Sequence, residues 1–313
     1  MKIQSTILLL AVLLFGCHGV RRDELQSPLR VAVISDLNSA YGSTTYEPEV
    51  HTAVRVITDE WRPDLVLIAG DMVAGQRPAL SDDNVRAMWA AFDSTVAAPL
   101  RRAGIPLLVT LGNHDASGHP GHERDRRIAR EYLGDAAFPT STLSLGSVFF
   151  LSIDASTGNV AADSAQLAWL RGTLASAEAR AARMRIVLGH VPLYAVAEGR
   201  NRAGEVQAEP DSLRTLLTRA GVDLFVSGHH HAYYPGQRDE LALLHAGALG
   251  QTPRPLIGSS AEPYKAMTLL ELFPARDSVA EQTWRVDGNR LTQVDRATLP
   301  ARIDGLNGFV LRR

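Results

Sequence analysis

The segment LLVTLGNHD, residues 107–115, decides the fold that we expect for this chain. Its apolar residues, Leu107, Leu108, Val109 and Leu111, have the length and branching of a short buried strand. Asn113, His114 and Asp115 then stand at the C-terminal end of that strand, which is the edge where open α/β sheets bind ligands. An amide oxygen, an imidazole and a carboxylate in a row offer a metal ligand, a proton donor and an orienting acceptor.

Four more segments repeat this pattern of an apolar run followed by polar side chains. Because each run has the length of a strand, the polar groups of all five segments can meet at one sheet edge. A single histidine in one such turn would more often be an ordinary surface residue, so the prediction depends on the recurrence. The four segments are 31–35 ahead of Asp36 and Asn38, 65–69 ahead of Asp71, 185–188 ahead of His190, and 222–226 ahead of His229 and His231.

Helical spacing of apolar residues between the strands indicates an α/β protein. Beyond residue 241, alternating apolar runs and a turn at 287–289 predict an added antiparallel segment. We interpret the charged stretch 117–130 as a solvated loop running into a helix, in preference to a substrate-facing role for its arginines, and 198–209 as a mobile loop. The predicted helices are 49–60, 82–103, 164–182 and 212–220, and one more strand, 148–153, ends at Asp154.

The length and the charge of the chain limit the classes of protein to which it can belong. A chain of 313 residues with 45% hydrophobic content buries a large core, and one large domain is the simplest arrangement. There are 32 Lys and Arg residues against 34 Asp and Glu residues, for a net charge of -2. This balance provides no basic field that would attract nucleic acid, so we expect no specific nucleic-acid partner.

The first residues predict export. Residues 1–16 contain one lysine and an apolar run at 7–15 that is too short to span a bilayer, as in a signal peptide. The sequence LFGC that ends at Cys17 resembles the bacterial lipoprotein processing box, and no other cysteine is present for a disulfide. We therefore expect a lipid on Cys17, a tether at 17–30, and a domain at 31–313 that is anchored to the cell envelope and faces the periplasm or the exterior. The alternative is a plain secretory signal followed by a chance cysteine.

The polar strand ends suit transition metals. Imidazole and carboxylate ligands together favour ions such as Mn, Fe, Zn or Ni over Ca or Mg. The ligands are numerous enough for two ions. A pair roughly 3.5 to 4 Å apart binds two oxygens of a phosphate and lowers the pKa of a bridging water. The resulting hydroxide would hydrolyse phosphate esters near neutral pH.

The joint pattern resembles the calcineurin-like metallophosphoesterase superfamily. The five blocks of that family are D-x-H, G-D, G-N-H-D/E, G-H and G-H-x-H, and this chain has DLN at 36–38 followed by GD, GNHD, GH and GHHH. The resemblance covers residues 30–250, which leaves 251–313 as a C-terminal β extension. It implies an α/β fold in the form of a four-layer sandwich, with two mixed β-sheets flanked by helices.

The resemblance also implies a role for each matching residue. Asp71 would bridge two ions. His114 would bind no metal and would protonate the leaving alkoxide, with Asp115 fixing its orientation. Asp36 and His231 would complete the first metal site, and Asn113, His190 and His229 the second.

Asn38 departs from the family pattern, which most often has a histidine there. Its amide oxygen is a weaker ligand and suits a harder ion. Three alternatives stay open: Asn38 binds directly, Tyr41 or Tyr46 supplies a phenolate as in the purple acid phosphatase relatives, or the first site is weak. The purple acid pattern has its tyrosine three residues after the GD aspartate, where this chain has Ala74.

Two functions follow from these residues. The first is metal-dependent hydrolysis of phosphomonoesters or phosphodiesters, with a metal-bridging hydroxide as nucleophile. The alternative is a non-catalytic lipoprotein that binds metal or phosphate and has a degenerate first site. We favour the enzyme because His114 and every second-site ligand are present. The loops that would select the substrate fit nucleotides, phospholipid head groups and small phosphate esters equally well.

Replacing Cys17 with Ser should release the protein from membranes without unfolding it, because the lipid is lost and no disulfide is broken. Membrane fractionation of the variant and mass spectrometry of the wild-type N-terminus measure this. An unmodified mature N-terminus upstream of Cys17 in the wild type would contradict the prediction.

Overall fold

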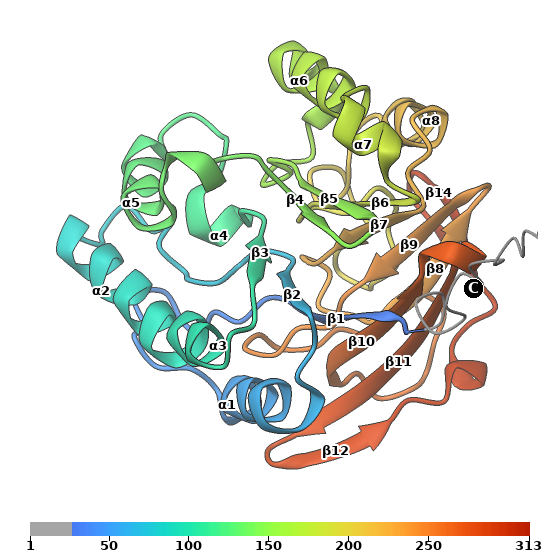
Figure 1. Ribbon diagram of the computed structural model, residues 1–313. Helices are drawn as coiled ribbons and strands as arrows, with labels where there is room; N and C mark the ends of the chain where they lie inside the picture. The colour runs from blue at the N-terminus through green and yellow to red at the C-terminus, as the bar shows by residue number, and fades with distance from the viewer. Residues whose placement is uncertain (1–26) are drawn as a thin grey trace, which may run out of the picture.

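Residues 27–313, described by a computed structural model, form two β-sheets that pack against each other (Figure 1). The predicted signal peptide, Cys17 and most of the predicted tether lie outside the described residues. The first sheet has six strands in the order β12-β11-β10-β1-β2-β3. Its strands are β1 (Leu29–Ile34), β2 (Leu65–Ile68), β3 (Leu107–Val109), β10 (Lys265–Phe273), β11 (Ser278–Asp287) and β12 (Arg290–Gln293).

The second sheet has eight strands in the order β13-β14-β8-β9-β7-β6-β5-β4. Both sheets are mixed, because each combines a parallel set with antiparallel strands. The strands of the second sheet are β4 (Ser141–Leu145), β5 (Val148–Ser152), β6 (Met184–Leu188), β7 (Leu224–Ser227), β8 (Tyr234–Arg238), β9 (Leu241–His245), β13 (Arg302–Gly305) and β14 (Gly308–Arg312).

Helices cover the outer faces of both sheets, which confirms the expected four-layer sandwich (Figure 1). The helices α1, α2, α3 and α5 lie beside the first sheet, and α6, α7 and α8 lie beside the second. Short 3-10 turns are η4 (Asp135–Ala137), η5 (Val160–Ala162), η6 (Pro274–Arg276) and η7 (Arg296–Thr298). The α-helices are α1 (Pro48–Arg55), α2 (Asp82–Phe92), α3 (Ala98–Arg102), α4 (Asn113–Ala116), α5 (Glu123–Leu133), α6 (Ser164–Leu174), α7 (Ala177–Ala181) and α8 (Pro210–Arg219).

The alternation of side chains along β1 explains this layering. Successive strand residues point to opposite faces of a sheet. Val31 and Val33 accordingly belong to the core between the two sheets, whereas Ala32 and Ile34 pack in a second cluster with the helices of the first sheet. Because both faces are buried, the strand is apolar throughout, as parallel strands in α/β proteins are.

The C-terminal strands are part of both sheets. β10 pairs antiparallel with β1, so the added antiparallel segment predicted from the sequence completes the first sheet. β14 pairs with β8 and brings β13 into the second sheet. Strand β1 begins at Leu29, paired with Leu272, two residues earlier than the predicted tether allows. Among residues 27–313, no helix is long and apolar enough to cross a membrane.

Two of the predicted helices are interrupted. The predicted helix 82–103 contains a π-helical turn, η3 (Asp93–Ala97), between α2 and α3, directly ahead of Pro99. Proline has no N–H to continue the helical bonding pattern. The predicted helix 164–182 is divided into α6 and α7, because Ser176 accepts a hydrogen bond from Ala179 N and caps a new helix. A second π-helical turn, η2 (Val56–Trp61), extends α1.

The direction of the strands positions the polar strand ends. Strands β1, β2 and β3 are parallel, and so are β5, β6, β7 and β9. Parallel strands place their C-terminal ends at one edge of a sheet, and loops at that edge form ligand sites. The predicted ligands follow five of these seven strands.

Candidate metal centre

All seven predicted metal ligands meet at the C-terminal edge of the two sheets. Six are buried and Asn113 is half-buried. The first sheet supplies the oxygen ligands and the second sheet supplies the imidazoles. The ligands are Asp36 and Asn38 after β1, Asp71 after β2, Asn113 after β3, His190 after β6, and His229 and His231 after β7.

The contacts place five of the ligands in two groups that share Asp71. Asp36, Asp71 and His231 each offer one ligand atom, and these atoms lie within 4.8 Å of one another. In the other group, His190 Nε2 lies 3.4 Å from Asp71 Oδ2 and 3.1 Å from Asn113 Oδ1. This is the grouping expected for two metal sites with a common carboxylate.

Several ligand atoms are buried without a hydrogen-bond partner among the described residues. They are both side-chain atoms of Asn38, Asp71 Oδ2, His229 Nδ1 and His231 Nε2. A buried polar atom without a partner costs about 1–3 kcal/mol, so native structures seldom keep several of them together. Each unpartnered oxygen and imidazole nitrogen suits a metal ion, so the residues fit the centre that the sequence predicts.

The second nitrogen of each histidine ligand is already engaged. His190 Nδ1 donates to Ala69 O at 2.7 Å, and His231 Nδ1 donates to Thr252 O at 3.0 Å. His229 uses its two ring nitrogens in the opposite way, because its Nε2 donates to Glu205 Oε2 at 2.8 Å. Such bonds fix the tautomer and leave the other nitrogen with a lone pair for a metal.

Electrostatics at the centre favour bound cations. Burial alone would raise the pKa of Asp71, but the neighbouring His190 and His114 hold it well below its usual range. Burial would also lower the pKa of His190, but the Asp71 carboxylate overrides burial and raises it to about 9. Burial lowers the pKa of His229 to about 4, which leaves its ring neutral. Metal ions and protons compete for such nitrogens, so metal binding should weaken as pH falls.

Backbone strain is concentrated at the ligands. Asp36, Asp71, His229 and His231 have φ angles of 51°, 56°, 67° and 52°. For residues other than glycine this left-handed conformation costs on the order of 1–3 kcal/mol and is typical of functional sites. The GNHD glycine has a packing reason, because a Cβ on Gly112 would lie 2.0 Å from Asp71 Oδ1. The strand ends are thus turned sharply to aim their side chains at one point.

A model of the calcineurin-like phosphoesterase family matches residues 29–233. The chain belongs to this family. The matched span contains all five sequence blocks and all seven predicted ligands.

Known relatives agree with the family. Mouse serine/threonine-protein phosphatase CPPED1 is 29% identical over 153 residues, which are 47% of this chain and 48% of that protein. Purple acid phosphatase 22 of Arabidopsis thaliana is 27% identical over 214 residues, 66% of this chain and 45% of that protein. The chain thus spans about half the length of the curated relatives that it matches.

A solved structure shows the same fold. Purple acid phosphatase PPD1 from yellow lupin seeds superimposes with a TM-score of 0.61 at 15% sequence identity. The match covers 86% of this chain and 53% of the lupin chain.

His114, the general acid implied by the phosphoesterase family, lies beside the two ligand groups. Its side chain is 16% exposed and its Nε2 lies 4.0 Å from Asp71 Oδ2. Its Nδ1 lies 3.1 Å from the side-chain amide nitrogen of Gln76, which we did not predict as a site residue. The exposed fraction leaves a path from solvent to the ring.

The structure corrects the expected role of Asp115. No hydrogen bond joins its carboxylate to the His114 ring among the described residues. Its oxygens instead accept from the backbone nitrogens of Asp71, Val73 and Gly112, each at 2.8 Å. Asp115 therefore fixes the backbone of the GD and GNHD loops, and Gln76 is the residue that holds the His114 ring.

The structure also bears on the three candidates for the remaining ligand of the first metal site, which are Asn38, Tyr41 and Tyr46. The Tyr46 hydroxyl donates to Met72 O at 2.9 Å and burial raises its pKa, and both observations disfavour a Tyr46 phenolate at the first site. Tyr41 is 41% exposed, and its hydroxyl lies 3.3 Å from the Gln76 amide nitrogen. Asn38, whose buried amide has no hydrogen-bond partner among the described residues, is the better candidate ligand.

The insert 117–130 supports the site from outside. It runs into α5 as predicted, and two of its arginines bind backbone carbonyls. Arg124 donates to Gly75 O, and Arg126 donates to Ala116 O and to Asp154. These contacts give the arginines a structural role and agree with the interpretation that we preferred.

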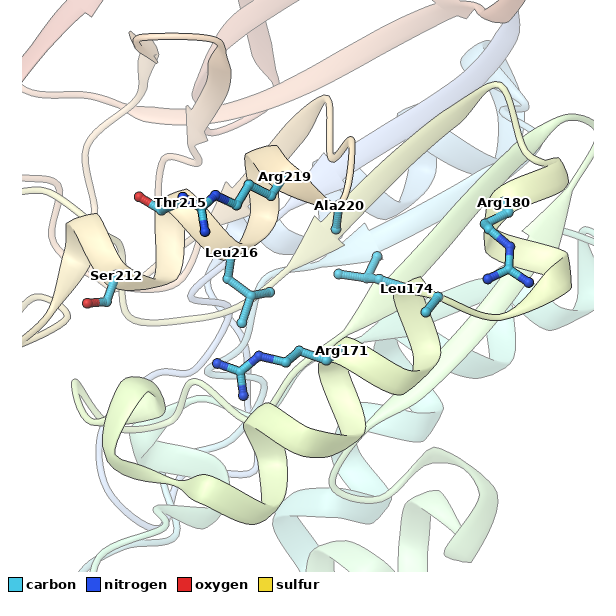
Figure 2. A pocket seen from close by; sticks show the side chains of 9 residues that line it. Arg171, Leu174, Arg180, Ser212, Thr215, Leu216, Arg219 and Ala220 are labelled. Atoms are coloured by element: carbon cyan, nitrogen blue, oxygen red, sulfur yellow. The ribbon is translucent and has the colours of Figure 1, made fainter.

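One cavity in the described part of the chain lies away from the metal centre. It has a volume of about 540 Å³ and lies between α6, α7 and α8 (Figure 2). Arg185, near the start of β6, donates to the carbonyls of Arg180 and Gly221 at 3.4 and 3.3 Å, so this cavity is near the N-terminal ends of the strands. It is lined by Arg171, Leu174, Ala175, Arg180, Ser212, Thr215, Leu216, Arg219 and Ala220.

Replacing Asn38 with His should tighten binding of the ion held by Asp36 and His231 about 10- to 100-fold, because an imidazole replaces a weak amide ligand. Metal stoichiometry after mild chelation measures this, with Tyr41→Phe as the control. If only Tyr41→Phe loses the first ion and Asn38→His changes nothing, a tyrosinate completes the site.

Proposed function

We propose that this protein hydrolyses phosphate esters at a centre that binds two transition-metal ions. The observation that carries the proposal is a set of buried atoms on Asn38, Asp71, His229 and His231 that have no hydrogen-bond partner among the described residues. Asp71 is also the carboxylate that the two ligand groups share. A protein without bound cations would gain nothing from this costly arrangement.

The chain offers a ligand set for each ion. Mn, Fe, Zn or Ni suit this mixture of imidazole and oxygen donors. When bound, such a pair of ions polarises the phosphate and activates water as a nucleophile. Asp71 would serve both ions; Asp36, Asn38 and His231 would hold the first, and Asn113, His190 and His229 the second.

His114 would donate a proton to the leaving oxygen of the ester. Its Nδ1 lies against the Gln76 amide, which leaves Nε2 on the side of Asp71 and the ligand groups. A positioned imidazole donor contributes typically 10²- to 10⁴-fold to such a step. The presence of this donor supports an enzyme over a protein that only binds metal or phosphate.

The substrates that we propose are phosphomonoesters or phosphodiesters. The relatives are named as a serine/threonine-protein phosphatase and a purple acid phosphatase, which supports hydrolysis of phosphate esters. We further propose that the protein is exported and held on the cell envelope by a lipid on Cys17. In that location its substrates would be outside the cytoplasm.

Replacing His114 with Ala should lower kcat about 10²- to 10⁴-fold and leave metal content near the wild-type value, because only the proton donor is removed. The measurement combines elemental analysis with assays on p-nitrophenyl phosphate and bis(p-nitrophenyl) phosphate, after separate loading with Mn, Fe, Zn or Ni.

His190→Ala is the matched control, because it removes a ligand from the same edge and should lose metal. An empty site in His114→Ala would reverse the two assignments. Wild-type protein that holds two ions and turns over neither ester type would favour the binding protein instead.

A further inference from the structure

Glu205, a residue that the sequence did not single out, contacts the metal centre from the loop 198–209. The loop 198–209, predicted to be mobile, is held against the site. The Glu205 carboxylate accepts a hydrogen bond from His229 Nε2 at 2.8 Å, and its side chain is only 13% exposed. His229 Nδ1, the ring atom left for a metal, has no partner among the described residues.

Two arginines of the same loop hold the Glu205 carboxylate. Arg202 Nη2 lies 2.8 Å from Glu205 Oε1, and Arg200 donates to Oε2. The hydrogen bond from His229 and the contacts with both arginines fix the orientation of the carboxylate.

The neighbouring His230 seats the loop as well. Its Nε2 donates to the backbone oxygen of Glu205 at 2.9 Å, and its Nδ1 accepts from Val196 N at 3.3 Å. The middle histidine of the GHHH block thus binds the backbone oxygen of Glu205, while the first one, His229, binds the Glu205 carboxylate. The two histidines therefore hold the same residue of the loop.

The turn between β13 and β14 supports the loop from behind. Leu306 N donates to Asn201 Oδ1 at 2.6 Å. Asn307 Nδ2 donates to Leu193 O at 2.6 Å and to Gln207 O at 3.3 Å. This hairpin lies outside the span 29–233 that matches the family model. It gives the C-terminal extension a direct connection to both ends of the loop.

We propose that Glu205 is a positioning residue for the metal centre and that the β13–β14 hairpin holds it in place. A carboxylate on the outer nitrogen of a histidine ligand fixes the ring and raises its basicity, and its loss typically costs 10- to 100-fold in metal affinity. The inference rests on the proposed metal centre and does not require that the protein hydrolyse a particular ester.

The experiment compares Glu205→Ala with Glu209→Ala in the full chain, loaded with Zn. Glu209 is in the same loop, but its carboxylate contacts the Ser212 hydroxyl instead of a ligand. After graded chelation, Glu205→Ala should release one ion about 10- to 100-fold more readily than wild type and keep the other, whereas Glu209→Ala should match wild type. Equal retention of both ions in Glu205→Ala would overturn the proposal.

Glu205→Gln is a second variant in case Glu205→Ala does not fold, because glutamine keeps the shape of the side chain and an acceptor oxygen but removes the charge. It should lie between wild type and Glu205→Ala in the same release experiment. A cobalt-substituted series should show a changed visible spectrum in both Glu205 variants and an unchanged one in Glu209→Ala. Loss of both ions together from folded Glu205→Gln would contradict a selective role.

A readout without metal separates this proposal from the proposed function. In ¹⁵N-histidine NMR spectra of metal-free protein, His229 should carry its proton on Nε2, and Glu205→Ala should remove this preference. A proton on Nδ1 in the wild type would overturn the role of Glu205 even if metal binding is confirmed. Asn307→Ala should weaken retention of the same ion, and an unchanged value would overturn the role of the hairpin.

Discussion

The burial of two carboxylates at the junction of the sheets is the constraint on which the structure depends. Asp36 and Asp71 have no exposed surface. An isolated charge in such a place is too costly to keep without compensation. His231 and His190 each lie 3.4 Å from one of these carboxylates. Cations at the buried atoms that have no hydrogen-bond partner among residues 27–313 would compensate these carboxylates more fully.

Neither sheet holds a complete site. The first sheet supplies the aspartates and Asn113, and the second supplies the three imidazoles, so the centre exists only when the sheets pack in register. The shared core, in which Val33 and Leu67 of the first sheet meet Phe225 of the second, fixes that packing. Strained φ angles at the ligands are tolerated because this rigid core determines them. The packing of this core therefore stabilises an arrangement in which charged groups are held at one point.

The family resemblance allowed prediction of the sandwich, and the apolar runs allowed prediction of where the candidate ligands lie, because each of them follows a run that marks a buried strand. Asn113 and Asp71, for example, were assigned from their place after such runs and from the family pattern. The partners of these residues were not predictable. Asp115 binds backbone nitrogens, which leave no sequence signal, and Glu205 reaches His229 from 24 positions away through tertiary packing. The division of one predicted helix at Ser176 likewise follows from a local cap that helical periodicity does not reveal.

The most direct test is a crystal structure of the protein loaded with Mn or Zn, with anomalous diffraction measured at the absorption edge of the metal. Two anomalous peaks should appear, one on either side of Asp71. The ion at one peak should be bound by Asp36 and His231, and the ion at the other peak by His190 and His229. A peak bound only by exposed side chains, or none at Asp71 in fully loaded crystals, would contradict the proposed metal centre.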